Sequence, residues 1–112
     1  NENLMGKTRI SPEILQGIKT RLQETYGDRL KGVVLYGSEA RGEAEEDSDV
    51  DLLVLLDGQV KALGDLRTII DTLCPIRQEL DRPIHATPVE FSAYQEGKFS
   101  LYRNVKEEGV LL

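Results

Sequence analysis

Two aspartates separated by one residue are the side chains in this sequence best suited to chemistry. Asp49 and Asp51 open an apolar segment, residues 49–56, that is typical of a buried strand. Because side chains alternate along a strand, both carboxylates should point to one face, with alpha carbons about 7 Å apart. Two carboxylates this close repel each other, and a hard divalent cation between them removes the repulsion. The pair therefore predicts a metal site, with Mg²⁺ as the ion because it binds oxygen ligands and keeps exchangeable waters.

A second pair, Gly37 and Ser38, follows another apolar segment, residues 32–36. A glycine at the end of a buried strand lets a phosphate approach the backbone closely. Ser38 is placed to begin a short helix through Ala40 and Arg41, so its hydroxyl and the first N–H groups face a phosphate. A strand ending in Gly-Ser beside a strand beginning with Asp-x-Asp would hold a triphosphate against bound metal. This arrangement predicts attack on phosphorus, catalysed by positioning and charge neutralisation.

Three competing motif interpretations fail on individual residues. Residues 47–51 match the start of an EF-hand calcium loop, but that loop needs glycine in place of Leu52 and a bidentate acid in place of Gly58. Residues 37–42 have the length of a P-loop frame, but residues 43–44 are Glu-Ala where lysine and a hydroxyl residue are required. The sequence also contains no G-x-G-x-x-G.

Hydrophobic spacing and turn residues predict the elements that position these side chains. Residues 11–13, Ser-Pro-Glu, are typical of a helix start, and an apolar stripe then continues to the region of Gly27. A second helical stripe covers residues 63–73. Pro75 should end or kink that helix, with a further turn to Leu80.

The rest of the chain predicts one more strand and weaker helices. Residues 82–90 contain Pro83 and Pro88, which favours a short peripheral strand. Residues 91–106 are weakly helical, with a break near Gly97. The resulting order α-β-β-α-β-α predicts an α/β chain (α+β in some schemes) with a small mixed β-sheet and packed helices.

Composition limits the classes of function. The sequence has 112 residues, which predicts a single domain over residues 1–112, with residues 1–9 expected to be disordered. Its net charge of -6 argues against broad nucleic-acid binding, which needs a basic patch. A single cysteine excludes an internal disulfide, and one cysteine with one histidine argues against most transition-metal sites and against a Ser-His-Asp site. We expect no membrane association, and a cytoplasmic location because no signal-peptide pattern is present.

The spacing of these motifs resembles a known family. Gly37-Ser38, ten residues, and then Asp49-Val50-Asp51 form the GS-x10-DxD signature of the DNA polymerase beta-like nucleotidyltransferases. The longer GSEARGEAEEDSDVDLLV is similar to the minimal nucleotidyltransferases of that superfamily, and chain length and element order agree with them.

The resemblance implies the nucleotidyltransferase fold and a magnesium-dependent transfer of a nucleoside monophosphate, AMP from ATP, to a hydroxyl acceptor. It implies that Asp49 and Asp51 are the catalytic metal ligands for two Mg²⁺ ions, and that Gly37 and Ser38 hold the β- and γ-phosphates. Arg41 is implied to lie in the adjoining nucleotide-binding loop. The partners implied are a nucleoside triphosphate and a HEPN-domain protein, in a toxin-antitoxin pair, with a homodimer as another source of the missing acceptor site.

Two points leave alternatives open. The family's third carboxylate has no clear counterpart, because His85 stands where it is expected and Asp81 and Glu90 lie outside the pattern. The alternative function is therefore a non-catalytic binding antitoxin or nucleotide-binding module with a degraded active site. Arg41 has two interpretations, a contact with substrate or an ion pair with the acidic residues 43–47, which otherwise predict a solvated loop.

Overall fold

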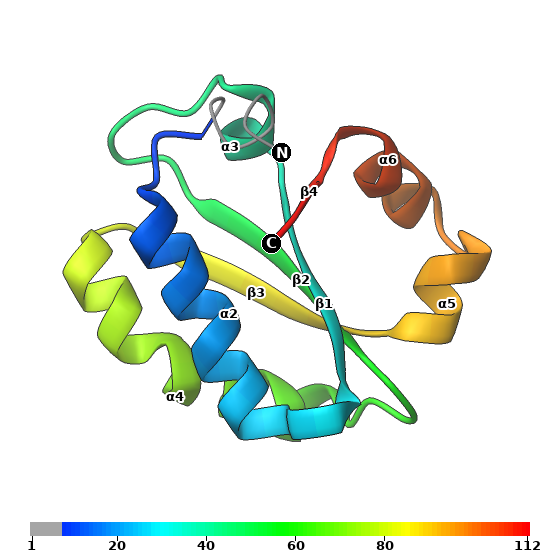
Figure 1. Ribbon diagram of the computed structural model, residues 1–112. Coiled ribbons are helices and arrows are strands. Elements are labelled where there is room, and N and C mark those ends of the chain that lie inside the picture. Colours follow the sequence, from blue (N-terminus) through cyan, green and yellow to red (C-terminus); the bar gives the residue numbers. More distant parts are fainter. Residues whose placement is uncertain (1–7) are drawn as a thin grey trace.

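The structure is a computed structural model that describes residues 8–112 (Figure 1). Helices and strands alternate along most of the chain, in the predicted order. The elements are α2 (Pro12–Tyr26), the 3-10 turn η1 (Gly27–Arg29), β1 (Leu30–Tyr36), α3 (Ser38–Arg41), β2 (Val50–Leu56), α4 (Ala62–Leu80), β3 (Ile84–Glu90), α5 (Phe91–Glu96), α6 (Ser100–Glu108) and β4 (Val110–Leu111).

The strands form one four-stranded mixed sheet in the order β3-β2-β1-β4. Strand β1 is antiparallel to both β2 and β4, and β2 is parallel to β3. Helix α4 makes the crossover that a parallel pair requires. The prediction of a small mixed sheet with packed helices is therefore confirmed, and β3 is an edge strand as its prolines indicate.

Helices cover both faces of the sheet, with α2 and α4 on one side and α5 and α6 on the other (Figure 1). Alternate residues of β2 enter different cores: Leu52 and Val54 pack with α2 and α4, whereas Leu53 and Leu55 pack with Val89 and the α6 side. This burial on both faces explains why β2 is a continuous apolar segment instead of an alternating one.

The start of α2 follows the sequence signal. Ser11 caps the helix, and its Oγ accepts a hydrogen bond of 3.3 Å from the N–H of Ile14, while Pro12 occupies the first turn. The helix ends at Gly27, which has a positive φ of 57°. The predicted break near Gly97 also occurs, with φ of 65°, between α5 and α6.

Helix α4 continues through Pro75 to Leu80 and is one helix in the structure. Leu73 and Ile76, on either side of the proline, are both buried against the core, whereas Pro75 itself is exposed. The apolar contacts of the last turns stabilise the helix beyond the proline. The alternative in which Pro75 ends the helix is therefore wrong, and the predicted continuation to Leu80 is confirmed.

The two ends of the chain add features that local pattern does not predict. Strand β4 has two residues, Val110 and Leu111, which pair with Leu35 and Val34. Such a short segment has no measurable periodicity. Disorder is expected for residues 1–9, of which residues 1–7 lie outside the described residues. Thr8 and Arg9 are both hydrogen-bonded to Glu39. None of the helices within residues 8–112 has the length and apolar character to cross a membrane.

Replacement of Pro75 by alanine should stabilise the protein. Alanine restores a helical N–H donor near the carbonyl of Asp71 and removes the ring from the helix interior. We expect the free energy of unfolding, measured with urea, to rise by up to about 3 kcal/mol. A Pro75→Ala variant that is less stable than the wild type would contradict this description of α4.

Candidate active site

Sheet topology brings the predicted site residues to one end of the sheet. Because β1 and β2 are antiparallel and β2 and β3 are parallel, the end of β1 meets the starts of β2 and β3. Tyr36 pairs with Asp51, and Asp51 pairs with His85 on its other side. The order across this end is therefore the Gly37 turn, the aspartates and then His85.

Gly37 lies directly against Asp51. Its φ of 74° is a backbone conformation that side chains disfavour, and a Cβ at this position would lie 2.5 Å from Asp51 Oδ2. The backbone conformation and the close approach of Asp51 therefore both favour glycine at position 37. The predicted proximity of the Gly-Ser pair to the Asp-x-Asp pair is present in the structure.

Ser38 begins the short helix α3, as predicted. The turn is closed by a hydrogen bond of 3.2 Å from the N–H of Arg41 to the Gly37 carbonyl, and another of 2.9 Å from Glu43 to the Ser38 carbonyl. Ser38 is half-buried and directly follows the glycine that lies against Asp51. Its hydroxyl is therefore a candidate donor to an anionic ligand at this end of the sheet.

The two carboxylates have different surroundings. Asp49 lies just before β2 with 48% of its side chain exposed, and its Oδ2 is 3.6 Å from Nδ1 of His85. Asp51 is half-buried inside β2. Burial raises the pKa of Asp51 above its usual value and the Asp49 carboxylate adds to the rise, whereas His85 and Arg41 oppose it. A divalent cation would relieve this unfavourable charge.

The donor set fits a hard cation that shares its coordination with a ligand. Within residues 8–112, no group of three or more histidine, cysteine, aspartate or glutamate side chains is arranged to hold a metal ion. The chain therefore offers Asp49 and Asp51, both reachable from solvent, and leaves the other positions to water and phosphate oxygens. Mg²⁺ is commonly bound in this way, through one or two carboxylates and substrate phosphates.

His85, and not Asp81, lies beside the aspartates. His85 is opposite Asp51 in the register, and its side chain is 63% exposed. Asp81 ends α4, where it adopts a left-handed conformation with φ of 56°, and lies four residues before this register position. The alignment that puts His85 at the position of the family's third acid therefore agrees with the pairing of β2 and β3.

Arg41 is engaged by acids in this structure. Its Nε is 2.8 Å from Glu43 Oε1, and its Nη1 is 3.3 Å from Glu108 Oε2 on α6. The predicted ion pair with the acidic loop is confirmed for Glu43. A cavity of about 240 Å³ lies beside Arg41, between Gly37 and α6. The role of Arg41 in nucleotide binding stays a prediction.

A buried ion pair that sequence reasoning missed lies behind the site. Glu39 is fully buried in α3, and its Oε2 is 2.7 Å from Nη2 of Arg82, which is 8% exposed. The other oxygen of Glu39 accepts hydrogen bonds of 2.6 Å from the Thr8 hydroxyl and from the Arg9 N–H. Burial alone would raise the pKa of Glu39, but these donors and Arg82 hold that pKa below its usual value. No local pattern marks either residue as buried.

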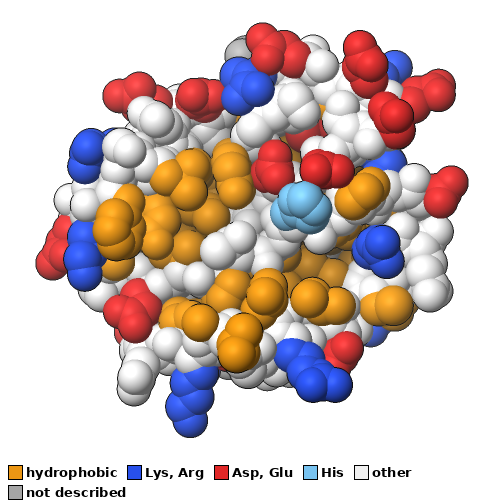
Figure 2. Space-filling view, turned by 180° about the vertical axis from the view of Figure 1, so that it is seen from behind, with side chains coloured by type: hydrophobic (Ala, Val, Ile, Leu, Met, Phe, Trp, Pro, Cys, Tyr) orange, Lys and Arg blue, Asp and Glu red, His pale blue; other side chains and the backbone are white. Residues whose placement is uncertain are grey.

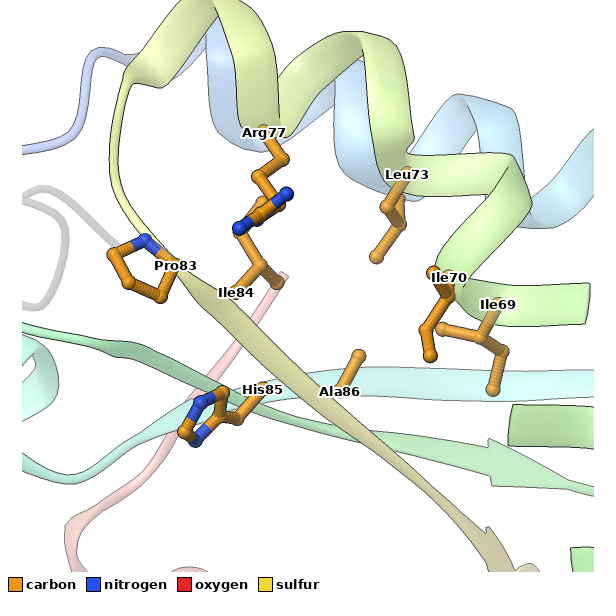
Figure 3. Close-up of a pocket in the computed structure, with 8 residues that line it drawn as sticks. All are labelled: Ile69, Ile70, Leu73, Arg77, Pro83, Ile84, His85 and Ala86. Carbon is orange, nitrogen blue, oxygen red and sulfur yellow. The ribbon is translucent and has the colours of Figure 1, made fainter. Parts of the chain in front are cut away.

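An apolar groove adjoins the site across strand β3. Residues of α4 and β3 line a cavity of about 250 Å³, and Figure 3 shows Ala86 pointing toward α4 while the ring of His85 points away from it. On the surface, the histidine lies beside acidic side chains, with hydrophobic side chains next to them (Figure 2). Exposed Leu63 and Ile70 extend the apolar surface along α4. The groove and the charged site are thus neighbours on different faces of the edge strand.

Comparisons with known proteins agree with this geometry. The family model described as "Nucleotidyltransferase domain" matches residues 15–112, which include the whole sheet and every predicted site residue. The chain is 33% identical over 92 residues to "Putative protein adenylyltransferase MJ0604" of Methanocaldococcus jannaschii, which covers 81% of this chain and 86% of that protein. It is 56% identical over 41 residues to "Protein adenylyltransferase MntA" of Thermococcus cleftensis, covering 37% of this chain and 39% of that protein.

Replacement of Gly37 by alanine should displace Asp51. Gly58 is the control for a positive φ, since its φ of 81° also disfavours alanine but nothing lies within 4 Å of its Cβ position. Gly58→Ala should cost roughly 1–2 kcal/mol of stability from backbone strain alone. Gly37→Ala should cost more in urea unfolding, because Asp51 must also move. Equal losses for the two variants would contradict the close packing of Gly37 on Asp51.

Replacement of Glu39 by glutamine should change the pH dependence of stability. Because the folded-state pKa of Glu39 is below its unfolded value, its stabilisation is present above the unfolded pKa and is lost as pH falls through the folded pKa. Glu39→Gln should be less stable at pH 7 by roughly 3–5 kcal/mol, since it leaves Arg82 unpaired. Thermal unfolding should show this difference shrinking under acidic conditions. A difference that is constant with pH would mean that the carboxylate is not held ionised by the fold.

Proposed function

Because the chain belongs to the nucleotidyltransferase domain family, we propose that it transfers AMP from ATP to a hydroxyl group on a protein, with Mg²⁺ held by Asp49 and Asp51. The observation that supports the proposal is the close approach of Asp51 to the Gly37 turn, since a glycine turn can bind phosphate and a carboxylate can bind a metal ion. The relatives supply the acceptor class, since they carry the name protein adenylyltransferase.

In the proposed reaction, the acceptor oxygen forms a bond to the α-phosphorus of ATP. The bond from that phosphorus to the bridging oxygen breaks, pyrophosphate leaves with the electron pair, and the acceptor proton passes to solvent. Mg²⁺ supplies charge neutralisation for the phosphates and lowers the pKa of the attacking hydroxyl. The family signature favours two ions, which Asp49 and Asp51 would hold, and Asp51 lies between the end of β1 and His85 in the strand register.

The chain's own residues bind and orient the nucleotide in this scheme. Gly37 leaves room for a phosphate at the backbone, and Ser38 donates its hydroxyl to the β- or γ-phosphate. Attack and departure are roughly in line in such transfers. Because Ser38 lies on the β1 side of the aspartates, we place the leaving pyrophosphate there and the acceptor on the β3 side, near His85. Arg41 must exchange at least one carboxylate partner to reach a phosphate.

The acceptor is proposed to belong to a partner protein. The resemblance of the sequence to minimal nucleotidyltransferases favours a HEPN-domain protein in a toxin-antitoxin pair, with a hydroxyl side chain as acceptor. The acidic residues 43–47, mostly exposed beside the site, favour a partner with basic character. A second copy of this chain is the other candidate. Size-exclusion chromatography with light scattering separates the two, since only the second predicts a dimer of the isolated chain.

A second function is favoured by one specific observation, the histidine in place of a third acid. Imidazole is a poorer Mg²⁺ ligand than a carboxylate. Because His85 stands opposite Asp51 where a third carboxylate is expected, metal binding would be weakened and transfer lost. The chain would then neutralise its partner by binding to it, without transferring AMP. The two functions differ in one variant: Asp51→Asn abolishes neutralisation if transfer is required and leaves it intact if binding suffices.

Replacement of Asp51 by asparagine tests the proposed metal role. Even groups that only support metal ligands affect affinity by about 10–100-fold, so loss of a ligand should weaken Mg²⁺-dependent ATP binding by at least about 100-fold. Calorimetric titration with and without Mg²⁺ measures this effect, with Asp57→Asn, an exposed aspartate at the far end of β2, as the control. ATP affinity that is unchanged in Asp51→Asn would overturn the assignment.

The same variant should be more thermostable than the wild type at neutral pH. Because the folded-state pKa of Asp51 is raised, its effect on stability is most favourable below the unfolded pKa and worsens as pH rises through the folded pKa. Asparagine has no charge to bury. We expect the melting temperature of Asp51→Asn to exceed that of the wild type at pH 7, and the difference to disappear as the pH falls below the pKa of Asp51 in the unfolded chain. A lower melting temperature at pH 7 would contradict this account of the site's charge.

A further inference from the structure

The proposed site depends on the distance between two segments that the chain joins by an exposed loop. Ser38 begins α3, and Asp49 follows the loop that starts after Gly42. Most side chains of that loop are exposed. Its last turn is closed locally, by hydrogen bonds of 2.8 and 3.2 Å between Glu45 and Ser48, which do not reach α3. Something outside the loop must therefore fix Asp49 relative to Ser38.

The guanidinium of Arg82 spans these two segments. Its Nη2 donates to Glu39 Oε2 at 2.7 Å, and its Nε donates to the Ser48 carbonyl at 2.9 Å. Glu39 is the neighbour of Ser38 in the chain, and Ser48 is the neighbour of Asp49. One rigid planar group thus connects the residue after the phosphate-binding serine to the residue before the first aspartate.

The next residue continues the connection on the other side of Asp49. The Pro83 carbonyl accepts a hydrogen bond of 2.9 Å from the N–H of Val50. Arg82 and Pro83, which directly precede β3, therefore bind Ser48 and Val50, the two chain neighbours of Asp49. Because His85 is two residues after Pro83, these bonds also fix Asp49 relative to His85.

The burial of the pair indicates a role beyond stability. Glu39 is fully buried and Arg82 is 8% exposed. In the described part of the chain, every buried side-chain nitrogen and oxygen has a hydrogen-bond partner. Desolvation offsets much of the Coulomb attraction in a buried ion pair, so apolar residues of similar volume are often as stable. An apolar residue in place of Arg82 could not form hydrogen bonds to two separate segments. Arg82 does so by donating to the Glu39 carboxylate and to the Ser48 carbonyl.

We propose that Arg82 and Glu39 are positioning residues that set the separation of Ser38 from Asp49, and thereby the affinity for a ligand that must contact both. This inference rests on the proposed function, in which that ligand is Mg²⁺-ATP. Lysine cannot replace arginine here, because one ammonium lacks the planar fork that reaches two acceptors in fixed directions.

The test compares Arg82→Lys with variants that lose stability elsewhere. Ile18 is fully buried in the middle of α2, so Ile18→Val and Ile18→Ala bracket a range of stability losses in the hydrophobic core between the sheet and helices α2 and α4. Mg²⁺-ATP affinity is measured by calorimetry at a temperature where circular dichroism shows all variants folded. We expect the dissociation constant to rise at least tenfold in Arg82→Lys and to stay within twofold of wild type in both Ile18 variants.

A second readout does not depend on nucleotide binding. Amide hydrogen exchange, followed by NMR, should become faster in Arg82→Lys for residues 38–42 and 48–51, and stay unchanged in the middle of α2. Where Arg82→Lys does not fold, Glu39→Asp takes its place, because it keeps the charge and shortens the reach by one methylene. The same two readouts then apply.

The affinity and exchange results together decide whether Arg82 is a positioning residue. An affinity loss in Arg82→Lys no greater than in the Ile18 variants would show a merely structural role and overturn it. A wild-type protein that does not bind Mg²⁺-ATP would overturn the proposed function, and exchange would then decide the positioning role separately. Faster exchange confined to the two segments would support that role, and exchange that is unchanged or uniformly faster would overturn it.

Discussion

A buried carboxylate with donors from three parts of the chain is the contact on which the rest of the site depends. Glu39 receives Arg82 from the start of β3 and both Thr8 and Arg9 from the segment before α2. Without it, α3 would be a single turn joined to an exposed loop. Through Arg82, which also binds the Ser48 carbonyl, the contact links α3 to the segment before β2, and the proposed positioning of Ser38 and Asp49 rests on this link.

The sheet supplies the other half of the constraint. Strand β2 is central and buried on both faces, so its start is rigid, and Asp51 is held there by pairing with Tyr36 and His85. This placement has an energetic cost, because burial and the nearby Asp49 disfavour the ionised form of Asp51. Binding of a cation would remove this unfavourable electrostatic energy, and its removal would add to the affinity for the cation. Ionisable groups with shifted pKa values are common at functional sites.

The fold and the line of site residues were largely predictable because their signals are local. The apolar segments of β1 and β2, the Ser11 cap and the Gly37-Ser38 to Asp49 spacing each lie within a few residues or one connection. Arg82 and Glu39 are 43 positions apart, and only the tertiary structure shows that they meet. The same applies to β4, which is too short for a pattern, and to Pro75, where burial of its neighbours outweighs local propensity.

The structure also shows where the sequence departs from the family pattern, at the position of the third carboxylate. On sequence alone, either His85 or Asp81 could have matched the missing third acid. Strand register selects His85, because it pairs with Asp51, while Asp81 ends the preceding helix. The register leaves two carboxylates and an imidazole around one position. The two proposed functions use the same arrangement of residues. They differ in whether the His85 imidazole can take the place of the third carboxylate.

The position of a nucleotide-bound cation tests most directly whether this end of the sheet is the active site. Mn²⁺, a paramagnetic substitute for Mg²⁺, can be added in small amounts with ATP to the isotopically labelled protein, and NMR signals near it broaden. We expect ATP-dependent broadening centred on Gly37, Ser38, Asp49 and Asp51, with the turn at Gly58, beyond the far end of β2, least affected. Broadening centred elsewhere, or none in the presence of ATP, would contradict the assignment of this end of the sheet as the active site.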